Sequence, residues 1–456
     1  FNRNRINLIL EIRMKNFLQF INHASIIISN GNKTILTDPW YAGTAFDDGW
    51  KLLYENEKDK ILNILTSVDY IWISHEHPDH FSINFLNEYH NILTEKKIIF
   101  IFQKTKDKRV ISFLKLKKLN FIELDNNEKF NLDDNFSIKL QKFDFYDCAL
   151  IAKVNDKKIF NLNDCPMNEQ QIRQFKDKYG SCDYLFTQFS YAAWKGGRDN
   201  LKWRNQASIE KTETLKNQSN ILNSKYTIPF ASFIKFADNY NSYLNDAVNT
   251  PKKILESKKN INAQLKFLKP YEKIDMDNPN EKTDGYEFWT NIYENKDNFQ
   301  IFENKKIYNF EKLSDEFNGY KDRIFKKNSQ ILIKIISKFK FLNYFQPLKV
   351  YLKDIDITIK IDLANNNFVK VDDEPDIEMF SRSLFLIFKQ DFGFDTLTVN
   401  GCFEEKKKNA FIKMSQCFAI GNLNNLGINL NYKIFLNLNI VLLFIKKIFS
   451  VKKKLI

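Results

Sequence analysis

The order of its apolar segments predicts an α/β fold for this chain of 456 residues. We expect a four-layer αββα sandwich, with two mixed sheets covered by outer helices, followed by a smaller α+β domain. Short β-branched runs alternate with helical patterns through the first half of the chain. Glycine turns join some of these runs directly, as in hairpins. A second series of strands and helices begins near Leu348.

The first predicted elements are a hairpin and a buried strand. Residues 17–29 are apolar and rich in β-branched side chains, residues 31–33 form a turn, and residues 34–40 make a second strand. Residues 68–74 are a nearly continuous apolar run, as a buried strand requires. Ser82 is expected to cap the helix that follows.

The remaining elements of the sandwich alternate in the same way. Further strands are expected at 96–102, 120–124, 136–145, 148–154, 157–164, 182–190 and 226–233. Helices are expected at 106–118, 167–180 and 206–225, the second of them ending at Gly180. This order places helices on the outer faces of two sheets.

The C-terminal part is predicted to be a separate α+β domain. Residues 348–363 alternate apolar and polar side chains and read as a strand pair, residues 376–393 as a helix, and residues 395–404 as a strand and turn. We therefore divide the chain into a catalytic domain at 14–255, a polar linker or extension at 256–335, and a domain of unknown role at 336–456.

Composition restricts the partners and the compartment. The net charge of +13 is spread among acidic residues, which is typical of a solvated surface and compatible with a small anionic substrate. No basic stripe interleaved with aromatic residues indicates nucleic-acid binding. The five cysteines form no C-x-x-C pair and no signal peptide is recognised, so we expect a reducing, cytoplasmic location.

The C-terminal tail leaves two interpretations open. The charge-free stretch 434–445 is shorter than the about 20 apolar residues that span a membrane, which favours a core strand or helix. Lysines at 446, 447 and 452–454 would also suit a weak anchor at a membrane surface.

The stretch ISHEHPDHF, from Ile73 to Phe81, holds three of the chain's five histidines. Its H-x-H-x-D-H pattern lies between a predicted buried strand and a predicted capped helix, where side chains converge from a rigid base. His75 and His77 are two residues apart and can grip one metal ion. Asp79 and His80 follow Pro78 and can serve a second ion beside the first.

This motif resembles that of the metallo-β-lactamase superfamily, whose αββα sandwich agrees with the predicted element order. Segments 22–50, 161–165, 183–194 and 229–251 are similar to the catalytic region of the CMP-N-acetylneuraminate hydroxylase family. Together they cover about residues 17 to 251. The resemblance implies a metal-dependent enzyme that acts on a nucleotide-linked acidic sugar.

The resemblance also implies a set of site residues. The implied metal ligands are His75, His77, Asp79, His80 and Asp164, of which Asp79, His80 and Asp164 are the implied catalytic residues. Asp164 lies in a turn after a strand, where the superfamily places its bridging carboxylate. His23 and Asp38 are expected near the same pocket, either as ligands or behind them.

Two ligands usual in the superfamily are missing, because this chain has no histidine after His90. Asp144 or Asp147 is a candidate for the mid-domain position, and Asp238 for the last one. A site with fewer imidazoles and more carboxylates favours harder metals. We therefore expect one or two divalent ions, either iron or zinc.

The hydroxylase family also carries a Rieske domain, which needs C-x-H and C-x-x-H ligand pairs. This sequence contains neither pair, so we expect no iron–sulfur cluster in the chain. Hydroxylation then requires a separate Rieske-type electron donor. The alternatives are a metal-dependent hydrolase of a phosphoester or acyl bond, and a degenerate protein that binds a metal or ligand without turnover.

Weaker signals concern the substrate. Lys195 and Arg198 flank two glycines and are candidates for binding an anionic group, although the spacing is not that of a phosphate loop. Asn241 lies in the last hydroxylase-like segment and is a candidate at the pocket rim.

Overall fold

The computed structural model describes residues 16–143, 146–301, 306–339, 343–425 and 427–432. The first sheet has seven strands in the order β17-β1-β2-β3-β6-β7-β8. These strands are β1 (Phe17–Asn22), β2 (Ser25–Ser29), β3 (Thr34–Thr37), β6 (Tyr70–Trp72), β7 (Ile99–Gln103), β8 (Asn120–Leu124) and β17 (Lys273–Asp275). Strands β2 and β3 pair antiparallel, which confirms the predicted hairpin, and β3, β6, β7 and β8 run parallel. The single strand predicted at 17–29 was wrong, because these residues form two strands, β1 and β2, that pair antiparallel across a turn at His23.

The second sheet also has seven strands, in the order β16-β14-β13-β12-β11-β10-β9. These strands are β9 (Lys129–Asp133), β10 (Phe136–Lys142), β11 (Cys148–Val154), β12 (Lys157–Asn163), β13 (Tyr184–Gln188), β14 (Tyr226–Phe230) and β16 (Gln264–Leu265). The two sheets face each other across an apolar core that includes Phe20, Trp72 and Phe186. Burial of such large side chains is the main stabilising contribution to a sandwich of this kind.

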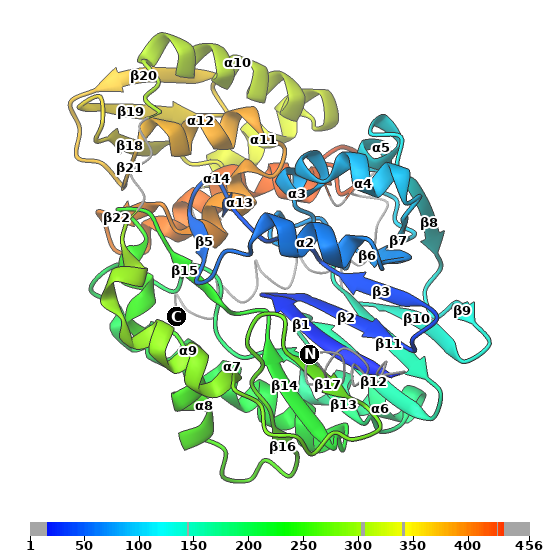
Figure 1. Cartoon of the computed structure of the whole chain (residues 1–456). Coiled ribbons are helices and arrows are strands. Elements are labelled where there is room, and N and C mark those ends of the chain that lie inside the picture. Colours follow the sequence, from blue (N-terminus) through cyan, green and yellow to red (C-terminus); the bar gives the residue numbers. More distant parts are fainter. Residues whose placement is uncertain (1–15, 144–145, 302–305, 340–342, 426, 433–456) are drawn as a thin grey trace.

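Helices cover the outer faces of both sheets (Figure 1). Those on the first sheet are α2 (Lys58–Leu65), α3 (Ile83–Glu88), α4 (His90–Glu95) and α5 (Arg109–Leu116). Those on the second sheet are α6 (Glu169–Tyr179) and α7 (Leu201–Ile221). The predicted stop of α6 at Gly180 is confirmed: this residue has a φ of 76°, which glycine adopts at little cost. The predicted αββα sandwich is confirmed.

The remaining elements outside the C-terminal part are short, and three of them, β4 (Thr44–Ala45), β5 (Trp50–Leu52) and β15 (Ile234–Phe236), form a small sheet. The others are the 3-10 helix η1 (Ser242–Ala247), α8 (Pro251–Glu256), α9 (Gly285–Glu294) and the 3-10 helix η2 (Lys296–Phe299). Strands β16 and β17 pair with β14 and β1, so residues 256–335 contribute edge strands to both sheets. The division at 255 and 336 stays a prediction.

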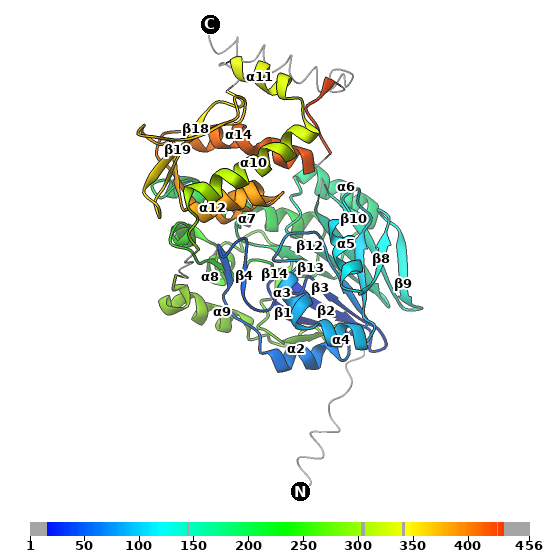
Figure 2. The same cartoon turned by 90° about the horizontal axis from the view of Figure 1, so that it is seen from above.

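The C-terminal part contains a five-stranded sheet in the order β20-β19-β18-β21-β22. Its elements are α10 (Phe310–Lys327), α11 (Gln330–Lys338), β18 (Leu348–Leu352), β19 (Ile357–Asp362), β20 (Asn367–Val371), β21 (Ile377–Met379), α12 (Ser381–Lys389), α13 (Gly393–Asn400), β22 (Phe403–Glu405) and α14 (Ala410–Asn425). Figure 2 shows α10, α12 and α14 beside this sheet. The predicted α+β character is confirmed.

The helix predicted at 376–393 is present as α12, but its first residues and the following predicted strand were wrong. Residues 377–379 form strand β21, paired with β18 and β22, where a helix was expected. Residues 395–400 lie in helix α13, where β-branched side chains favoured a strand. The helix ends at Gly401, whose φ of 67° is left-handed, and tertiary packing overrides the weak local preference.

The C-terminal part shares one hydrophobic cluster with the sandwich. The cluster joins Phe46, Trp50 and Trp194 to Leu397 and Phe403. Among the described residues no helix combines the length and apolarity needed to cross a bilayer. The tail at 434–456, for which an anchor or a core element was expected, lies outside the described residues.

Candidate metal centre

The histidine loop follows strand β6 at the carboxyl end of the parallel strands, as predicted. Its backbone turns tightly, because Phe81 donates its N–H to the His77 carbonyl oxygen over 2.7 Å. The Ser82 Oγ accepts the N–H of Phe85 at 3.2 Å and caps helix α3, which confirms the predicted cap. A buried strand and a capped helix therefore fix both ends of the loop.

Three ligand candidates converge on one side of the loop. The Nε2 atom of His75 lies 2.9 Å from the Nδ1 atom of His77. The Asp164 Oδ2 atom lies 3.8 Å from His75 Nε2 and also 3.8 Å from His80 Nε2. Asp164 follows β12 directly and stands between the two histidine sites, the position that a bridging carboxylate occupies.

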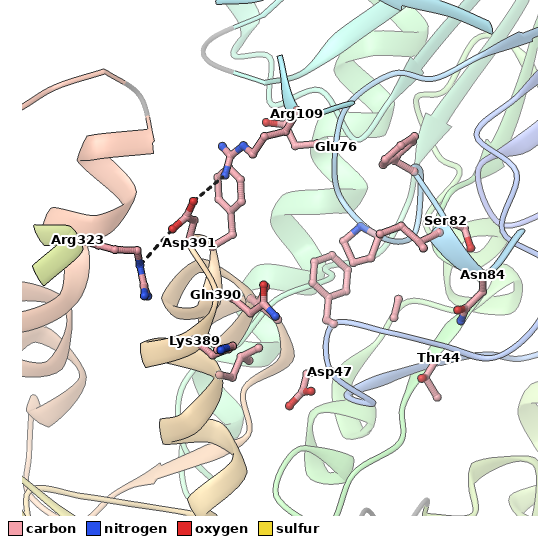
Figure 3. A pocket seen from close by; sticks show the side chains of 18 residues that line it. Thr44, Asp47, Glu76, Ser82, Asn84, Arg109, Arg323, Lys389, Gln390 and Asp391 are labelled. Carbon is pink, nitrogen blue, oxygen red and sulfur yellow. Dashed lines mark ion pairs between the residues drawn. The ribbon is translucent and has the colours of Figure 1, made fainter. Parts of the chain in front are cut away.

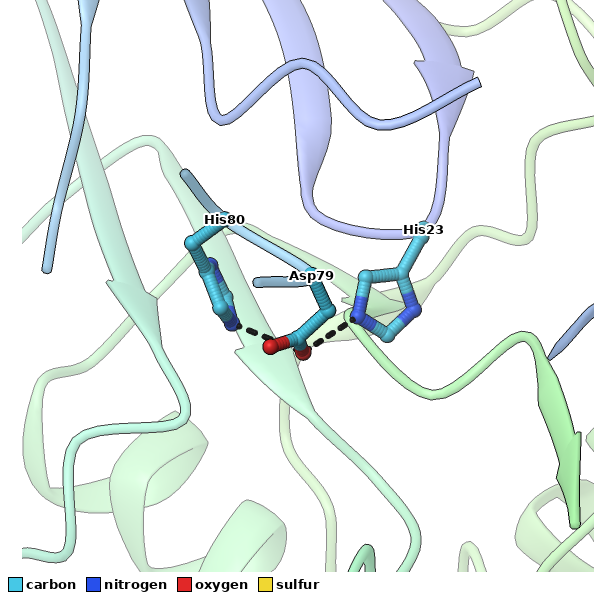
Figure 4. Close-up of side chains that lie close together, drawn as sticks. All are labelled: His23, Asp79 and His80. Carbon is cyan, nitrogen blue, oxygen red and sulfur yellow. Dashed lines mark hydrogen bonds and ion pairs between the residues drawn. The ribbon is translucent and has the colours of Figure 1, made fainter. Parts of the chain in front are cut away.

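Asp79 lies between the side chains of His23 and His80 and contacts both (Figure 4). Its Oδ2 atom lies 3.2 Å from His80 Nε2 and 3.2 Å from His23 Nε2. His23 occupies the turn between β1 and β2, with a φ of 38°. Its carbonyl oxygen accepts the N–H of Ala231 at 2.7 Å, which ties this turn to the end of β14.

The outer ring nitrogens of His75 and His80 also have partners. The Ser74 Oγ lies 2.9 Å from His75 Nδ1, and Asp38 Oδ2 lies 3.1 Å from His80 Nδ1. Such partners fix the tautomer and the orientation of a metal-binding imidazole. In both rings the Nε2 atom is thereby left facing the interior of the site.

Asp38 is the best-anchored carboxylate of the region. It is 1% exposed, and its Oδ1 atom accepts the backbone N–H of Ser74 at 2.7 Å. Its Oδ2 atom accepts the side-chain amide of Asn163 at 2.6 Å. Asp38 has a left-handed φ of 36°, and these hydrogen bonds hold it there.

The partner of His77 comes from the C-terminal part of the chain. The Asp395 Oδ2 atom, on helix α13, lies 3.6 Å from His77 Nε2. The side chain of His77 is 28% exposed and that of Asp395 32%. The Nδ1 atom of His77 is thereby turned toward His75.

The buried charges shift the pKa values of the groups on the Asp79 side. Burial lowers the pKa of His80, but the charges of Asp79, Asp164 and Asp38 outweigh burial and raise it well above its usual value. Burial raises the pKa of Asp79, but the charge of His80 and hydrogen bonds from His23 and His80 hold it well below the usual value. The pKa of Asp164 is lowered because the charges of His75 and His80 outweigh its burial.

The two remaining histidines shift in opposite directions. Burial, followed by the charge of His80, lowers the pKa of His75 well below its usual value. Burial also acts to lower the pKa of His77, but its hydrogen bond to Asp395 and the charge of Asp79 raise it to about 9. The carboxylates therefore favour positive charge at His77 and His80, whereas burial disfavours it at His75.

The donor set fits divalent metal ions. Two groups of possible ligands have all their donor atoms within 4.8 Å of one another: His23, Asp79 and His80, and His75, His80 and Asp164. His77 belongs to neither group, although its Nδ1 atom lies beside His75. The Oδ1 atoms of Asp79 and Asp164 are buried without a hydrogen-bond partner among the described residues. An unsatisfied buried carboxylate oxygen is costly, and coordination to a cation satisfies it.

The two described candidates for the missing histidines, Asp147 and Asp238, lie outside both ligand groups. Asp144 is outside the described residues, and neither ligand group contains Asp147. Asp238 is buried and pairs with Arg382, whose side chain is 3% exposed. Asp238 therefore neutralises a buried guanidinium where the C-terminal part meets the sandwich.

Two of the three predicted substrate residues make contacts within the protein. Arg198 pairs with Glu404 and donates to the Asn239 carbonyl oxygen at 2.8 Å. Asn241 donates to the carbonyl oxygens of Gly49 and Asn400 at 2.8 and 2.7 Å. Both residues thus tie the C-terminal part to the sandwich, which local sequence gave no means to foresee.

Lys195 lines a cavity of about 190 Å³ that opens onto the candidate ligands. The other lining residues are Phe46, Trp50, His77, Asp79, Asp164, Gln188, Tyr191, Ala192, Ala193, Lys211 and Val399. The lining thus combines three ligand candidates, His77, Asp79 and Asp164, with two lysines, Lys195 and Lys211.

A larger cavity, of about 620 Å³, lies against Glu76 and Pro78 of the same loop (Figure 3). Its cationic side chains are largely paired. Asp391 lies between Arg109, at 3.9 Å, and Arg323, at 3.5 Å. This cavity combines residues of α12 with residues around β4 and α3, so the C-terminal part forms one of its walls.

Sequence reasoning missed Ser74, Asp395 and Lys211. Ser74 directly precedes the motif, so its position was a usable signal. Asp395 is distant in sequence and was read as part of a strand. Lys211 was one lysine among several on a helix, and only its place on the buried face of α7 distinguishes it.

Comparison with known proteins agrees with this geometry. Residues 17–141 match the family model of the Beta-lactamase superfamily domain. The chain is 25% identical over 259 residues to the cytidine monophosphate-N-acetylneuraminic acid hydroxylase of Danio rerio, a match covering 52% of this chain and 42% of that protein. It is 28% identical over 239 residues to the hydroxylase of Xenopus laevis, covering 47% and 37%.

Among solved structures, the chain is similar to CmlA, a diiron β-hydroxylase from Streptomyces venezuelae. The TM-score is 0.41 at 11% identity, over 57% of this chain and 54% of that one. The matches to the two curated hydroxylases cover 42% and 37% of those proteins, so the chain spans less than half of their length. Residues 17–141 thus match a Beta-lactamase superfamily domain, the chain is similar to these hydroxylases over about half its length, and the predicted resemblance is confirmed.

Proposed function

We propose that this chain is a metalloenzyme with a two-metal centre that acts on a small anionic substrate. The observation that carries the proposal is the position of Asp164, whose Oδ2 atom is 3.8 Å from the Nε2 atoms of both His75 and His80. One ion would be held by His75 Nε2, His77 Nδ1 and Asp164. The other would be held by Asp79, His80 Nε2 and Asp164.

His23 is the proposed further ligand on the Asp79 side. Its Nε2 atom is as close to Asp79 Oδ2 as that of His80, at 3.2 Å. It would supply an imidazole where the chain lacks the last histidine usual in the superfamily. This set of imidazoles and carboxylates suits iron or zinc.

When bound, a pair of divalent ions supplies Lewis acidity and a bound water of lowered pKa. The protein's own groups set up the site for that chemistry. Asp38 and Ser74 hold the outer nitrogens of His80 and His75 and keep their tautomers fixed. Asp395 does the same for His77 from the C-terminal part.

For the reaction we propose hydroxylation of a nucleotide-linked acidic sugar. The similarity to the named hydroxylases over 259 and 239 residues supports this choice. Residues 1–456 contain no C-x-H or C-x-x-H pair for a Rieske cluster, and the electrons are proposed to come from a Rieske-type donor outside these residues. Without such a donor, the second candidate is hydrolysis of a phosphoester or acyl bond.

Metal analysis tests the proposal directly. The protein is purified without chelator and its metals are counted by mass spectrometry, with His77→Ala and His90→Ala in parallel. His90 is the matched control, because it bonds the Lys117 carbonyl oxygen at 2.8 Å outside the candidate ligand groups. We expect two equivalents in the wild type and in His90→Ala, and loss of at least one in His77→Ala.

The identity of the metal and a product assay separate the alternatives. Iron, together with product carrying one new hydroxyl group when a chemical reductant and oxygen are supplied, supports hydroxylation. Zinc with cleavage of a phosphodiester or ester supports hydrolysis. Wild-type protein without tightly bound metal would contradict the enzyme and support the degenerate, non-catalytic alternative.

A further inference from the structure

The cavity beside the ligand candidates contains a lysine that the proposed metal centre does not use. Lys211 lies on the buried face of α7, three and four residues after Ser208 and Ala207 and four before Leu215. Its Nζ atom donates to the Gln188 side-chain oxygen. No carboxylate pairs with it within hydrogen-bonding or salt-bridge distance among the described residues.

Lys211 is partly buried, and an ammonium group that loses contact with water without gaining an anionic partner is destabilised. Burial lowers the pKa of Lys211, and the more distant charge of Asp164 only partly opposes this effect. Lysines at the surface of the same helix carry no such cost. Lys202, for example, is exposed on the first turn of α7.

A second lysine reaches the cavity from a constrained loop. Lys195 precedes Gly196, whose φ is 86°. A Cβ on Gly196 would lie 2.8 Å from the Asn200 side chain, and the Gly196 carbonyl oxygen accepts the Tyr243 hydroxyl at 3.1 Å. The loop that carries Lys195 is therefore fixed in place.

The two lysines share their cavity with the ligand candidates His77, Asp79 and Asp164. The cavity has a volume of about 190 Å³. This space suits one end of a substrate, with its anionic group and its reacting group, and the rest must extend outward. In the larger cavity, by contrast, Arg109 and Arg323 already pair with Asp391.

We propose that Lys195 and Lys211 form an oxyanion subsite, which binds a carboxylate or phosphate of the substrate and directs its reacting group toward Asp79 and Asp164. This proposal rests on the proposed function and names the substrate feature that the site recognises. Two cations in one small cavity suit an oxyanion, because each ammonium can donate a charge-assisted hydrogen bond.

The test measures binding and is independent of turnover. Cytidine 5′-monophosphate supplies a phosphate and N-acetylneuraminate a carboxylate, the two anionic ends of the proposed substrate. Each probe is titrated calorimetrically into metal-loaded wild type, Lys195→Met, Lys211→Met and the matched control Lys202→Met. Methionine keeps the length and apolar stem of lysine while removing the charge.

We expect the affinity for one probe to fall about 10- to 100-fold in Lys195→Met and in Lys211→Met, as for loss of a hydrogen bond to a charged group. The probe that responds identifies the anionic end bound in the cavity. Lys202→Met should bind as the wild type does, and all four proteins should hold equal amounts of metal. Lys211→Arg should recover part of the lost affinity, which a purely structural role would not explain.

The two proposals fail in different ways. Unchanged affinity for both probes in the folded lysine variants, with metal present, would overturn the oxyanion subsite and leave the metal centre intact. Wild type without metal would overturn the proposed function, while the same titrations on that protein still decide whether the lysines bind an anion. Thermal melts confirm folding, and Lys195→Met gives a second reading if Lys211→Met is unstable.

Discussion

Replacing Asp38 with asparagine should weaken one metal site and spare the other. The Asp38 carboxylate accepts three donors: the Ser74 N–H at 2.7 Å, the Asn163 amide at 2.6 Å and the His80 ring at 3.1 Å. An asparagine has one acceptor oxygen, so in either orientation its NH2 group faces at least one of these donors. The orientation of His80 is then no longer fixed.

The size of the effect follows from these contacts. A hydrogen bond to a charged group contributes about 1.5–3 kcal/mol, and loss of a residue that orients a metal ligand typically lowers affinity about 10- to 100-fold. We therefore expect the ion at Asp79 and His80 to bind about 10- to 100-fold more weakly in Asp38→Asn. Asp395→Asn is the matched variant, since Asp395 contacts His77 and should weaken the ion at His75 and His77.

Calorimetric titration of metal-free protein with zinc measures both sites. In Asp38→Asn one of the two binding events should weaken, while the other stays within about twofold of the wild type. Comparison with Asp395→Asn, in which the other event should weaken, assigns each event to its site. Equal weakening of both events, or no change in either, in a protein that melts cooperatively would refute the assignment of Asp38 to His80.

Three further predictions concern stability. Gly49→Ala should destabilise the fold by about 1–3 kcal/mol, because its Cβ would lie 2.4 Å from the Asn400 Cβ; a urea melt equal to the wild type would contradict this. Arg382→Met leaves Asp238 charged and buried, so urea unfolding should show a loss of about 3–5 kcal/mol, which Asp238→Asn in the same chain should partly restore. A chelator should lower the melting temperature, and free metal at 100 times its Kd should restore about 2.7 kcal/mol; an unchanged melt would argue against metal binding to the folded state.

The sequence predicted most of the sandwich and the centre of the candidate site. Buried parallel strands such as β6 are recognisable as continuous apolar runs. Ser82 is a recognisable N-cap residue and predicts the helix after the histidine loop. The four ligand candidates of that loop lie close together because they are close in sequence. Asp164 was named because the resemblance to the superfamily implies it, and the predicted strand end and turn agree with that role.

The parts that escaped prediction depend on contacts distant in sequence. The segment at 395–400 is β-branched, and only its packing on the rest of the C-terminal part makes it a helix. Asp238 looked available for a metal but pairs with Arg382, a residue far along the chain. Lys211 resembled its neighbours until the buried face of α7 was known.

The contact between Asp395 and His77 bears on the order in which the protein is made. The two residues are 318 positions apart (395 − 77), so at about 5–20 residues per second a ribosome needs roughly 16–64 s to pass from one to the other. During that interval the nascent chain already contains the histidine loop. It still lacks the carboxylate that orients His77 and the Val399 wall of the small cavity. Synthesis itself therefore separates the emergence of the candidate ligands from the completion of the candidate site.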